Sequence, residues 1–460
     1  MVVGELSTFT DVVIIGGGPG GYTAAERIAR AGKRVVLVER DRLGGVCLNA
    51  GCIPSKALIQ VAHATALPLA AAAWGVEAKA VVDMDRVQTW MSSVVDGLRT
   101  DVAGVIHRAG VEVVAGIARF SSPRRIVVQG DGAARHIEFD HAVIATGSRP
   151  AVLAALPVDH VRLLDSTDAL ALRTVPPRLA VVGGGYIGLE LGCALHKLGS
   201  AVTVVEIGDR LLPSMHPALG AALGRRLVER GIEVLLHTSA VDDDGESLLV
   251  RGPAGERRLA VDAVLVCVGR RPNTDDLGLD RAGIPCQDSG HIAVDAARRA
   301  AGGVLAIGDV TAGPGLAHKA TAEAEIAAAT VIGRRAEFAP ACIPQVVFTD
   351  PEAASAGLTP QEAAAAGIAT VTRRLSLRAS PRAQLTGDAG FVELVAEAGG
   401  GALLGAHIVG ATAAELIAEA ALAIELGATL EDLALTIHPH PTASESLALA
   451  AGLRTRSAPC

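Results

Sequence analysis

Residues 12–40 read VVIIGGGPGGYTAAERIARAGKRVVLVER, and residues 179–207 read LAVVGGGYIGLELGCALHKLGSAVTVVEI. Each stretch passes from an apolar strand through a glycine turn and a helix pattern to a second strand that ends in glutamate. A constant offset of 167 residues relates Gly16 to Gly183, Gly18 to Gly185, Gly21 to Gly188, Gly32 to Gly199, and Glu39 to Glu206. The repeat predicts two βαβ units that each bind a dinucleotide.

The context of the two glycine turns is more specific than the turns themselves, because a lone GxGxxG occurs often by chance. Each turn follows a strand, opens a helix, and reaches a glutamate 21 residues beyond its middle glycine. The glycines let a pyrophosphate approach the helix N-terminus, and the carboxylate accepts hydrogen bonds from ribose hydroxyls. Because Glu206 would repel a 2′-phosphate, the second unit favours NAD over NADP, although Arg210 is near in sequence.

The length of 460 residues predicts three or four domains, since a domain usually has roughly 100 to 200 residues. From residue 341 onward, short apolar strands alternate with the helical run AAELIAEAALAIELG. We expect an α/β fold with two Rossmann-like dinucleotide-binding domains and a C-terminal α+β domain. The expected segments are 1–150 for the first dinucleotide, 151–273 for the second, which is NAD, 274–340 for a return to the first domain, and 341–460 for the last domain.

Composition excludes several classes of partner. The net charge is −8 and Lys and Arg do not cluster, so we expect neither nucleic acid nor an anionic membrane surface as a partner. The opening MVVGELSTFT has no basic segment of the secretory type, which predicts a cytoplasmic protein. The uncharged stretch 57–76 is long enough to be considered as a membrane span, but we interpret it as a buried soluble helix and the loop after it.

Two of the seven cysteines, Cys47 and Cys52, lie close together in GGVCLNAGCIPSKAL. In a regular helix they would be about 7.5 Å apart along the axis, so a disulphide requires an irregular chain, which Gly51 and Pro54 favour. With Pro54 as the first helical residue, Cys52 would lie at the positive end of the helix dipole, which favours its thiolate. The pair therefore suits electron transfer.

A structural pair or part of a metal site is the alternative for these cysteines. No second cysteine pair and no histidine cluster supplies further ligands, so we expect no metal. The remaining thiols are interpreted as core or inert surface residues: Cys193, Cys267, Cys286, Cys342 and Cys460. Thiol exchange also needs a base, because free cysteine has a pKa of about 8.5 and a histidine can take and return the proton near neutrality.

A set of motifs in fixed order resembles the pyridine nucleotide-disulphide oxidoreductase family along essentially the whole chain, most closely its dihydrolipoyl dehydrogenase branch. The motifs are GGGPGGY at 16–22, GGVCLNAGCIPSKAL at 44–58, VVGGGYIGLELG at 181–192, AIGDV at 306–310, GLAHKA at 315–320 and HPHPTASE at 438–445. The resemblance implies a homodimeric flavoprotein that oxidises dihydrolipoamide on a carrier protein and reduces NAD through a Cys47/Cys52 disulphide and FAD.

The resemblance also implies which residues form the two cofactor sites. For FAD it implies Gly16, Gly18, Gly21, Glu39, Gly116, Thr146, Gly147, Ser148, Asp309 and Ala317, with Asp309 at the ribityl or phosphate region and Ala317 near the flavin. Lys56 is expected near flavin N5, paired with Glu190 from the second unit. The remaining cofactor residues are Gly183, Gly185, Gly188, Glu206 and Gly269.

The catalytic roles are likewise those of the family. Cys52 is implied to be the charge-transfer thiol against the flavin, and Cys47 the thiol that exchanges with substrate. His440 is the general base, oriented by Glu445, and His438 is interpreted as structural. The family also implies that these two groups face each other across the dimer interface, with the thiols from one subunit and the base from the other.

Two departures from the family pattern leave the disulphide substrate open, and a third position has two interpretations. Asp350 stands where the family often has histidine, Gly315 stands where lipoamide dehydrogenases commonly have methionine, and Tyr186 is either a movable cover over the nicotinamide or a packing residue. Glutathione reductase would be expected to have basic residues for NADPH, and mercuric or large thioredoxin reductases would need a second C-terminal cysteine pair. A quinone reductase and a binding subunit without turnover are further alternatives.

Overall fold

The computed structural model describes residues 7–453, so Cys460 lies outside the described part of the chain. The chain divides into two units that are each discontinuous in sequence. The first contains residues 7–58, 83–151 and 269–339, and the second contains residues 59–82, 152–268 and 340–453. Each unit is described by itself below.

The first unit is built on one eight-stranded sheet. Its strands are β1 (Ser7–Ile15), β2 (Val35–Glu39), β3 (Glu112–Ala115), β4 (Ile117–Ser122), β5 (Arg125–Gln129), β6 (Arg135–Ile144), β17 (Arg299–Ala301) and β18 (Val304–Ala306). The main path runs β17-β18-β6-β1-β2-β3, and β1 is parallel to both of its neighbours. A separate two-stranded ribbon pairs β7 (Ser148–Pro150) with β16 (Arg270–Pro272). β18 therefore adds a late segment of the chain to the sheet that begins with β1.

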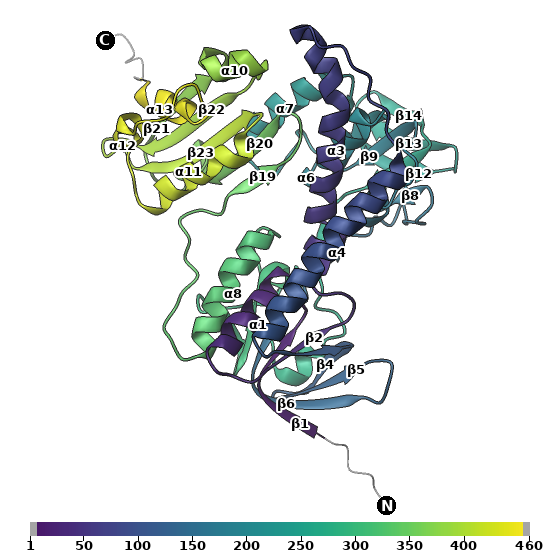
Figure 1. Cartoon of the computed structure of the whole chain (residues 1–460), viewed down its shortest axis with the longest axis vertical. Coiled ribbons are helices and arrows are strands. Elements are labelled where there is room, and N and C mark those ends of the chain that lie inside the picture. The colour runs from purple at the N-terminus through teal and green to yellow at the C-terminus, as the bar shows by residue number, and fades with distance from the viewer. Residues whose placement is uncertain (1–6, 454–460) are drawn as a thin grey trace, which may run out of the picture. The chain divides into compact units, whose positions relative to one another are not determined.

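Helices cover one face of this sheet, and the β4–β5 hairpin packs on the other. The helices of the unit are α1 (Pro19–Arg30), α2 (Gly45–Ala50), the start of α3 (Cys52–Ala71), α4 (Met84–Arg108) and α8 (Ala317–Val331). α1 and α8 lie side by side over the sheet (Figure 1), and Ile28, Ile106 and Ala324 are buried against its Val and Ile side chains. On the hairpin face, Phe120 and Phe139 meet edge to face with ring centroids 6.2 Å apart.

The second unit contains the second βαβ repeat in a five-stranded parallel sheet, in the order β11-β10-β9-β15-β8. Its strands are β8 (Leu163–Leu164), β9 (Arg178–Val182), β10 (Ala201–Val205), β11 (Glu233–Leu235) and β15 (Ala263–Val266). The helices beside it are α5 (Ser166–Leu170), α6 (Tyr186–Lys197) and α7 (Pro217–Glu229).

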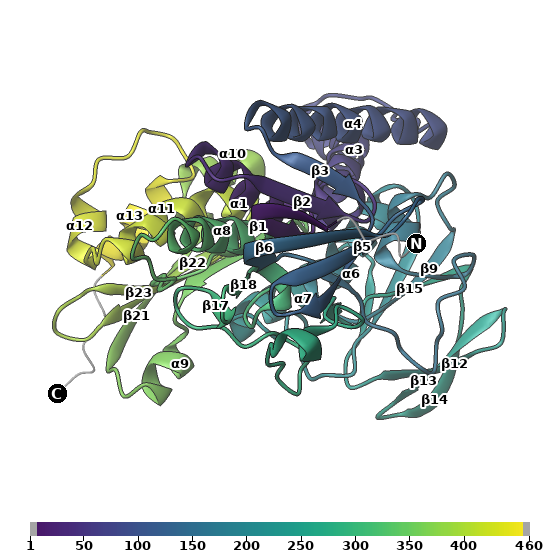
Figure 2. The same ribbon diagram turned by 90° about the horizontal axis from the view of Figure 1, so that it is seen from below.

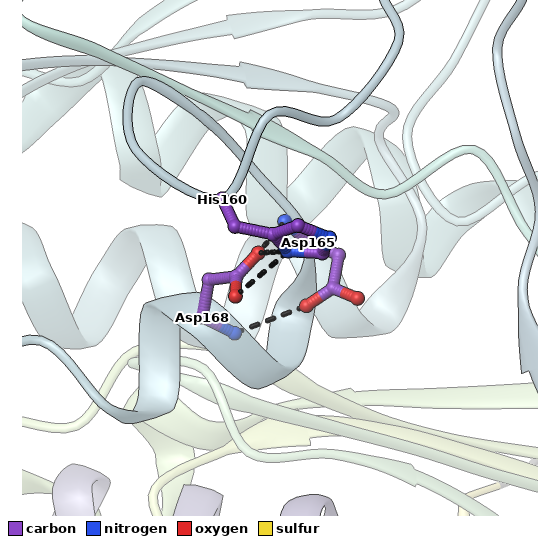
Figure 3. Close-up of side chains that lie close together, drawn as sticks. All are labelled: His160, Asp165 and Asp168. Atoms are coloured by element: carbon purple, nitrogen blue, oxygen red, sulfur yellow. Dashed lines mark hydrogen bonds and ion pairs between the residues drawn. The ribbon is translucent and has the colours of Figure 1, made fainter.

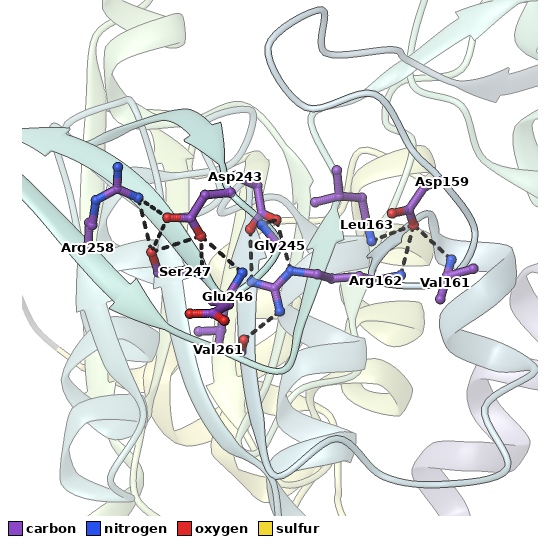
Figure 4. A network of polar contacts seen from close by, with 11 residues as sticks. Asp159, Val161, Arg162, Leu163, Asp243, Gly245, Glu246, Ser247, Arg258 and Val261 are labelled. Atoms are coloured by element: carbon purple, nitrogen blue, oxygen red, sulfur yellow. Dashed lines mark hydrogen bonds and ion pairs between the residues drawn. The ribbon is translucent and has the colours of Figure 1, made fainter.

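An antiparallel meander of β12 (Ser239–Asp243), β13 (Ser247–Gly252) and β14 (Gly255–Ala260) is attached to this parallel sheet. Arg162 makes the connection (Figure 4): its guanidinium donates to both oxygens of Asp243 at 2.9 and 3.0 Å and to the Val261 carbonyl at 2.7 Å. The side chain of Asp243 is only 5% exposed. Asp159 fixes the loop before Arg162 by accepting three backbone N–H groups at 2.8 Å each.

The C-terminal part of the second unit is an antiparallel sheet, ordered β19-β20-β23-β22-β21, with helices packed against it. Figure 2 shows β21, β22 and β23 beside one another. The strands are β19 (Gln345–Val347), β20 (Glu352–Gly357), β21 (Thr370–Ser376), β22 (Phe391–Glu397) and β23 (Leu403–Gly410), and the helices are α9 (Pro360–Ala365), α10 (Pro381–Thr386), α11 (Ala413–Glu425), α12 (Leu430–Leu435) and α13 (Glu445–Gly452). The predicted fold class, two dinucleotide-binding folds and an α+β domain, is confirmed.

The helix after the cysteines differs from the sequence expectation. α3 runs to Ala71 and continues as a 3-10 turn to Trp74, so no loop interrupts it. Its second half is largely exposed, with Leu69 86% and Trp74 60% accessible, and the prediction of a buried helix is wrong there. The segment 45–74 is long and apolar enough to cross a membrane by length and composition alone. Alanine explains the difference, because it favours helix strongly but has little side chain to bury.

Candidate functional site

The first glycine turn has the geometry that a pyrophosphate requires. Gly16 has a φ of +103°, and a Cβ atom there would lie 2.4 Å from the Ala145 carbonyl oxygen. A Cβ at Gly21 would lie 1.8 Å from the Gly16 oxygen, so only glycine fits. Gly18 caps α1 without a side-chain hydrogen bond, which leaves the first N–H groups of the helix to an anion. Glu39 closes the turn by accepting from the Gly17 N–H at 2.6 Å.

The second turn repeats this geometry. Gly183 has a φ of +108°, and a Cβ there would meet the Cys267 carbonyl oxygen at 2.3 Å. Around the cap of α6, a Cβ at Gly185 would meet nothing within 4 Å. Glu206 accepts from the N–H groups of Gly184 and Gly208, both at 2.6 Å, and is itself buried. Both turns therefore fit a dinucleotide.

Three further predicted residues lie beside the first turn. Gly116 follows β3, donates its N–H to the Glu39 carbonyl at 2.9 Å, and has a φ of +149°. Gly147 accepts from the Asn273 N–H at 2.8 Å, which fixes the turn after β6. The side chain of Thr146 donates to the Asn273 carbonyl at 2.7 Å. This part of the predicted FAD site is thus tied to the chain that returns from the second unit.

Asp309 and Ser148 are brought together by the structure. The Ser148 hydroxyl donates to Asp309 Oδ2 at 2.5 Å, and it accepts from Arg270 Nε at 2.7 Å. Gly269, with a φ of +119°, precedes Arg270 and accepts from the Ala151 N–H at 3.0 Å. Sequence reasoning missed Arg270, although it is part of the RRPN stretch at the end of the second predicted domain.

Beneath Asp309 lies a buried ionic network that the sequence did not reveal. Glu323, fully buried in α8, accepts from the Gly308 N–H at 2.6 Å, from Arg298 at 2.8 Å and from Lys319 at 3.0 Å. Such a carboxylate is stable only because donors surround it. The network holds the loop of Asp309 against α8, whose first residue is Ala317.

The two cysteines occupy separate helices. Cys47 belongs to α2 and Cys52 is the first residue of α3, with Gly51 breaking the helix between them. The expected irregularity at Gly51 is present, but the expected start at Pro54 is wrong, because the helix begins two residues earlier. Cys52 therefore lies in the first turn, at the positive end of the α3 dipole.

The two residues are present as thiols in hydrogen-bond contact. The hydrogen bond with Cys52 raises the pKa of Cys47, burial raises it further, and the charge of Lys56 opposes both. Burial also raises the pKa of Tyr22, with smaller contributions from the two thiols. Tyr22 thus lies near the pair, and its place in the GGGPGGY motif was the signal that could have shown it.

His440 and Glu445 form a pair in the second unit. His440 Nδ1 lies 2.8 Å from Glu445 Oε1, and Glu445 Oε2 accepts from the Thr442 N–H at 2.9 Å. The hydrogen bond from His440, followed by that from Thr442, lowers the pKa of Glu445. An ionised Glu445 accepts from Nδ1–H, so the acceptor nitrogen of a neutral His440 is Nε2. The histidine side chain is 68% exposed.

His438 has a carboxylate partner of its own. Its Nδ1 faces the Thr436 carbonyl at 2.9 Å and its Nε2 faces Glu419 at 2.7 Å. Burial lowers the pKa of His438, but the hydrogen bond to Glu419 and then the one to Thr436 outweigh it, so the pKa is raised. Because both nitrogens face acceptors, the surroundings of His438 favour its doubly protonated form. Spacing along the sequence did not indicate Glu419, which lies 19 residues earlier on α11.

A group of His160, Asp165 and Asp168 has donor atoms close enough to hold a metal (Figure 3). Its oxygens already have other partners: Asp165 accepts from the N–H groups of Thr167 and Asp168, and Asp168 accepts from the Asp165 N–H and faces His160. This is a capping box at the start of α5. The group is interpreted as a helix cap.

Comparison with known proteins identifies the family. Residues 10–324 match the family model described as pyridine nucleotide-disulphide oxidoreductase, and residues 343–451 match the dimerisation domain of the same family. The chain belongs to the pyridine nucleotide-disulphide oxidoreductase family. The predicted resemblance is confirmed, and the family's dimerisation domain supports a homodimer. Enzymes of this family use FAD and NAD(H), as the cofactor prediction states.

Several members of the family are similar over nearly their whole length. The dihydrolipoyl dehydrogenase of Geobacillus stearothermophilus is 42% identical, covering 97% of this chain and 96% of that protein. The dihydrolipoyl dehydrogenase of Halobacterium salinarum is 45% identical with the same coverage. Among solved structures, LpdA from Mycobacterium tuberculosis has a TM-score of 0.89 and 30% identity, covering 96% of this chain and 99% of that one. The flavoprotein disulfide reductase RclA from Escherichia coli has a TM-score of 0.86 and 27% identity, covering the same fractions.

Proposed function

We propose that this oxidoreductase is a dihydrolipoyl dehydrogenase, which oxidises dihydrolipoamide on a carrier protein and reduces NAD. The single observation that carries the proposal is the thiol pair Cys47 and Cys52, at the start of a helix and next to a glycine turn of dinucleotide-binding geometry. Relatives of that name, 42% and 45% identical over nearly the whole chain, support the substrate. We assign the activity to the cytoplasm.

The thiol pair carries the exchange with substrate. A dihydrolipoamide thiolate attacks Cys47 of the Cys47–Cys52 disulphide and releases Cys52 as a thiolate, with a mixed disulphide on Cys47. The second lipoyl thiolate then attacks this mixed disulphide, which frees lipoamide and leaves Cys47 reduced. Bound FAD and NAD⁺ supply the two-electron oxidation that restores the cysteine disulphide. The helix dipole of α3 favours the thiolate of Cys52.

His440 supplies the proton transfer in this scheme. Its Nδ1–H donates to Glu445, so Nε2 takes the proton from the attacking lipoyl thiol and returns it later. Glu445 holds the ring in this tautomer. We assign two further residues to the side of the cysteine pair that faces the flavin: Lys56, one turn after Cys52, and the buried Glu190.

Two assays test the proposed substrate and the roles assigned to Cys47 and Cys52. Turnover with NADH and lipoamide, glutathione disulphide, mercuric ion or a quinone should be fastest with lipoamide, and a faster turnover with any other acceptor would contradict the proposed substrate. In Cys47→Ser, the free Cys52 thiolate beside oxidised flavin should give a long-wavelength charge-transfer band without any reduction. A band in Cys52→Ser but not in Cys47→Ser would reverse the two assignments.

The proposal includes a site shared between two chains, with Cys47 and Cys52 from one and His440 and Glu445 from the other. Cys47→Ser and His440→Gln homodimers, both inactive, are unfolded, mixed and refolded together. Each mixed dimer then has one intact site, so about a quarter of wild-type activity should return from random pairing. If activity stays at the background of the parents despite confirmed exchange of subunits, each site is formed within one chain.

A further inference from the structure

Asp350 is a carboxylate held by two cations within the second unit. It lies between β19 and β20, where Lys197 Nζ approaches one of its oxygens to 2.5 Å. Arg230, which caps the C-terminus of α7, donates to both oxygens at 2.5 and 2.7 Å. Burial raises the pKa of Asp350, but Lys197 and then Arg230 outweigh it, so the pKa is lowered and the group is ionised. This is a charge-assisted, bidentate clamp.

The clamp forms one end of a longer contact along α6. Glu190, Cys193 and Lys197 share one face of this helix, because they stand at positions i, i+3 and i+7. Glu190 Oε1 accepts from the Phe348 N–H at 2.9 Å, and the thiol of Cys193 accepts from the backbone N–H of Asp350. The segment 348–350 is therefore held by α6 at three points, with Glu190 at one end and the Asp350 clamp at the other.

The electrostatic setting makes this contact sensitive to the charge on Asp350. Glu190 is 3% exposed, and a buried carboxylate is costly unless donors such as the Phe348 N–H stay in place. Lys197 and Arg230 bring two positive charges to the cluster. His63 of α3 also faces it, and burial followed by the charge of Lys197 lowers the pKa of this histidine. Without the Asp350 carboxylate, the positive charges of Lys197 and Arg230 face each other and His63 without a counter-charge, and the segment that donates to Glu190 loses its clamp.

We propose that Asp350 is a positioning residue for Glu190: by fixing segment 348–350 on α6, it sets the place of the carboxylate that acts on the flavin side of the reaction. The inference rests on the proposed function only for the role of Glu190. The contact itself joins the second βαβ repeat to the dimerisation domain within the second unit.

A double-mutant cycle on the FAD-loaded enzyme tests this. Asp350→Asn, Glu190→Gln and the double variant are compared in the flavin midpoint potential and in the rate of flavin reduction by NADH. Each single variant should shift the potential in the same direction and slow reduction roughly tenfold, since small misplacements of positioning groups have large effects on rate. The double variant should match Glu190→Gln alone, because both changes act through one group.

Two further measurements separate positioning from general stability. Hydrogen exchange of a peptide covering residues 345–351 should increase in Asp350→Asn. Asp243→Asn is the matched control: it breaks another bidentate arginine pair of the same unit and should lower the melting temperature without changing the flavin potential. If Asp350→Asn does not fold, Arg230→Met replaces it, since Arg230 is half of the clamp and more exposed.

The inference is overturned if Asp350→Asn is merely less stable, with wild-type flavin potential and reduction rate. Additive effects in the double variant would overturn it as well. So would a Glu190→Gln variant whose flavin potential and reduction rate equal those of the wild type. None of these readouts uses the disulphide substrate. A failure with lipoamide would therefore contradict the proposed function and leave the inference standing.

Discussion

The two βαβ repeats have nearly the same backbone but different surroundings. Gly16 and Gly183 differ by only a few degrees in φ, at +103° and +108°, and Glu39 and Glu206 each accept from a glycine N–H of their turn at 2.6 Å. The helices that follow the two turns, α1 and α6, differ in the contacts that they make away from the turn. The two glycine turns thus share one backbone geometry, while the rest of each unit makes other contacts.

That divergence is clearest at three positions related by the offset of 167 residues. In α6 these are Glu190, Cys193 and Lys197, which hold segment 348–350 of the dimerisation domain. In α1 they are Thr23, Glu26 and Arg30, and there Glu26 pairs with Arg30 at 2.7 Å, within the helix itself. A duplicated unit has therefore acquired a structural connection on the same face where its copy has a surface ion pair.

Alanine at the third glycine of each turn, Gly21 or Gly188, should produce the largest effect and separate the two units. In Gly21→Ala the new Cβ would overlap a backbone oxygen, so FAD affinity should fall at least about 100-fold and the protein should be isolated without flavin. In Gly188→Ala the new Cβ would lie 2.7 Å from the Gly183 carbonyl oxygen. This variant should keep its flavin and lose NADH binding. The absorbance ratio of flavin to protein measures the first, and NADH titration the second. Flavin loss in both variants would contradict the assignment of the first unit to FAD.

Coenzyme choice should follow from the acid of the second unit. Glu206 would face the additional phosphate of NADPH with a like charge, so NADH should be preferred in kcat/KM by roughly 100-fold. Steady-state kinetics with both coenzymes at equal ionic strength measures this ratio. Equal values would show that Arg210 or another cation compensates for Glu206.

Replacing Glu206 or Glu39 by alanine should have a smaller effect on cofactor affinity, and each change should affect one cofactor only. Glu206→Ala should weaken NADH binding roughly tenfold and leave flavin content unchanged, because it removes only hydrogen bonds of the second turn. Glu39→Ala should lower flavin affinity by a similar factor. Isothermal titration with NADH and flavin release on dilution give the two numbers. Equal losses at both sites in either variant would mean that the repeat has been misassigned.

The thiol of Cys193 should show the smallest effect. Burial raises its pKa to about 12, so at pH 8 it should resist iodoacetamide while the exposed Cys286 reacts. Because the folded-state pKa lies above the unfolded one, this thiol lowers stability only as the pH rises past about 9. Cys193→Ala should cost about 1 kcal/mol of stability and leave flavin content unchanged. Rapid labelling of Cys193 at pH 8, detected by peptide mass, would show that α6 opens.

Local sequence patterns allowed the fold and much of the candidate site to be predicted. The glycine turns, the two acids and the thiol pair lie within short segments, so their spacing carries the information. The missed features join distant segments: Arg270 with Ser148, Glu419 with His438, and Lys197 with Asp350 are brought together only by the tertiary fold. The exposed end of α3 was missed for another reason, since an apolar alanine-rich helix looks the same in sequence whether it is covered or not.

The carboxylate of Glu206 also limits how this enzyme could be redesigned. Both of its oxygens accept backbone N–H groups of the turn, from Gly184 and Gly208, before any ribose is bound. An arginine introduced there to accept NADPH would leave both amides without an acceptor and loosen a turn whose geometry fits a pyrophosphate. A successful exchange of coenzyme would have to replace these two hydrogen bonds as well as the charge. Selection for NADP use from this scaffold would therefore require several substitutions together rather than one.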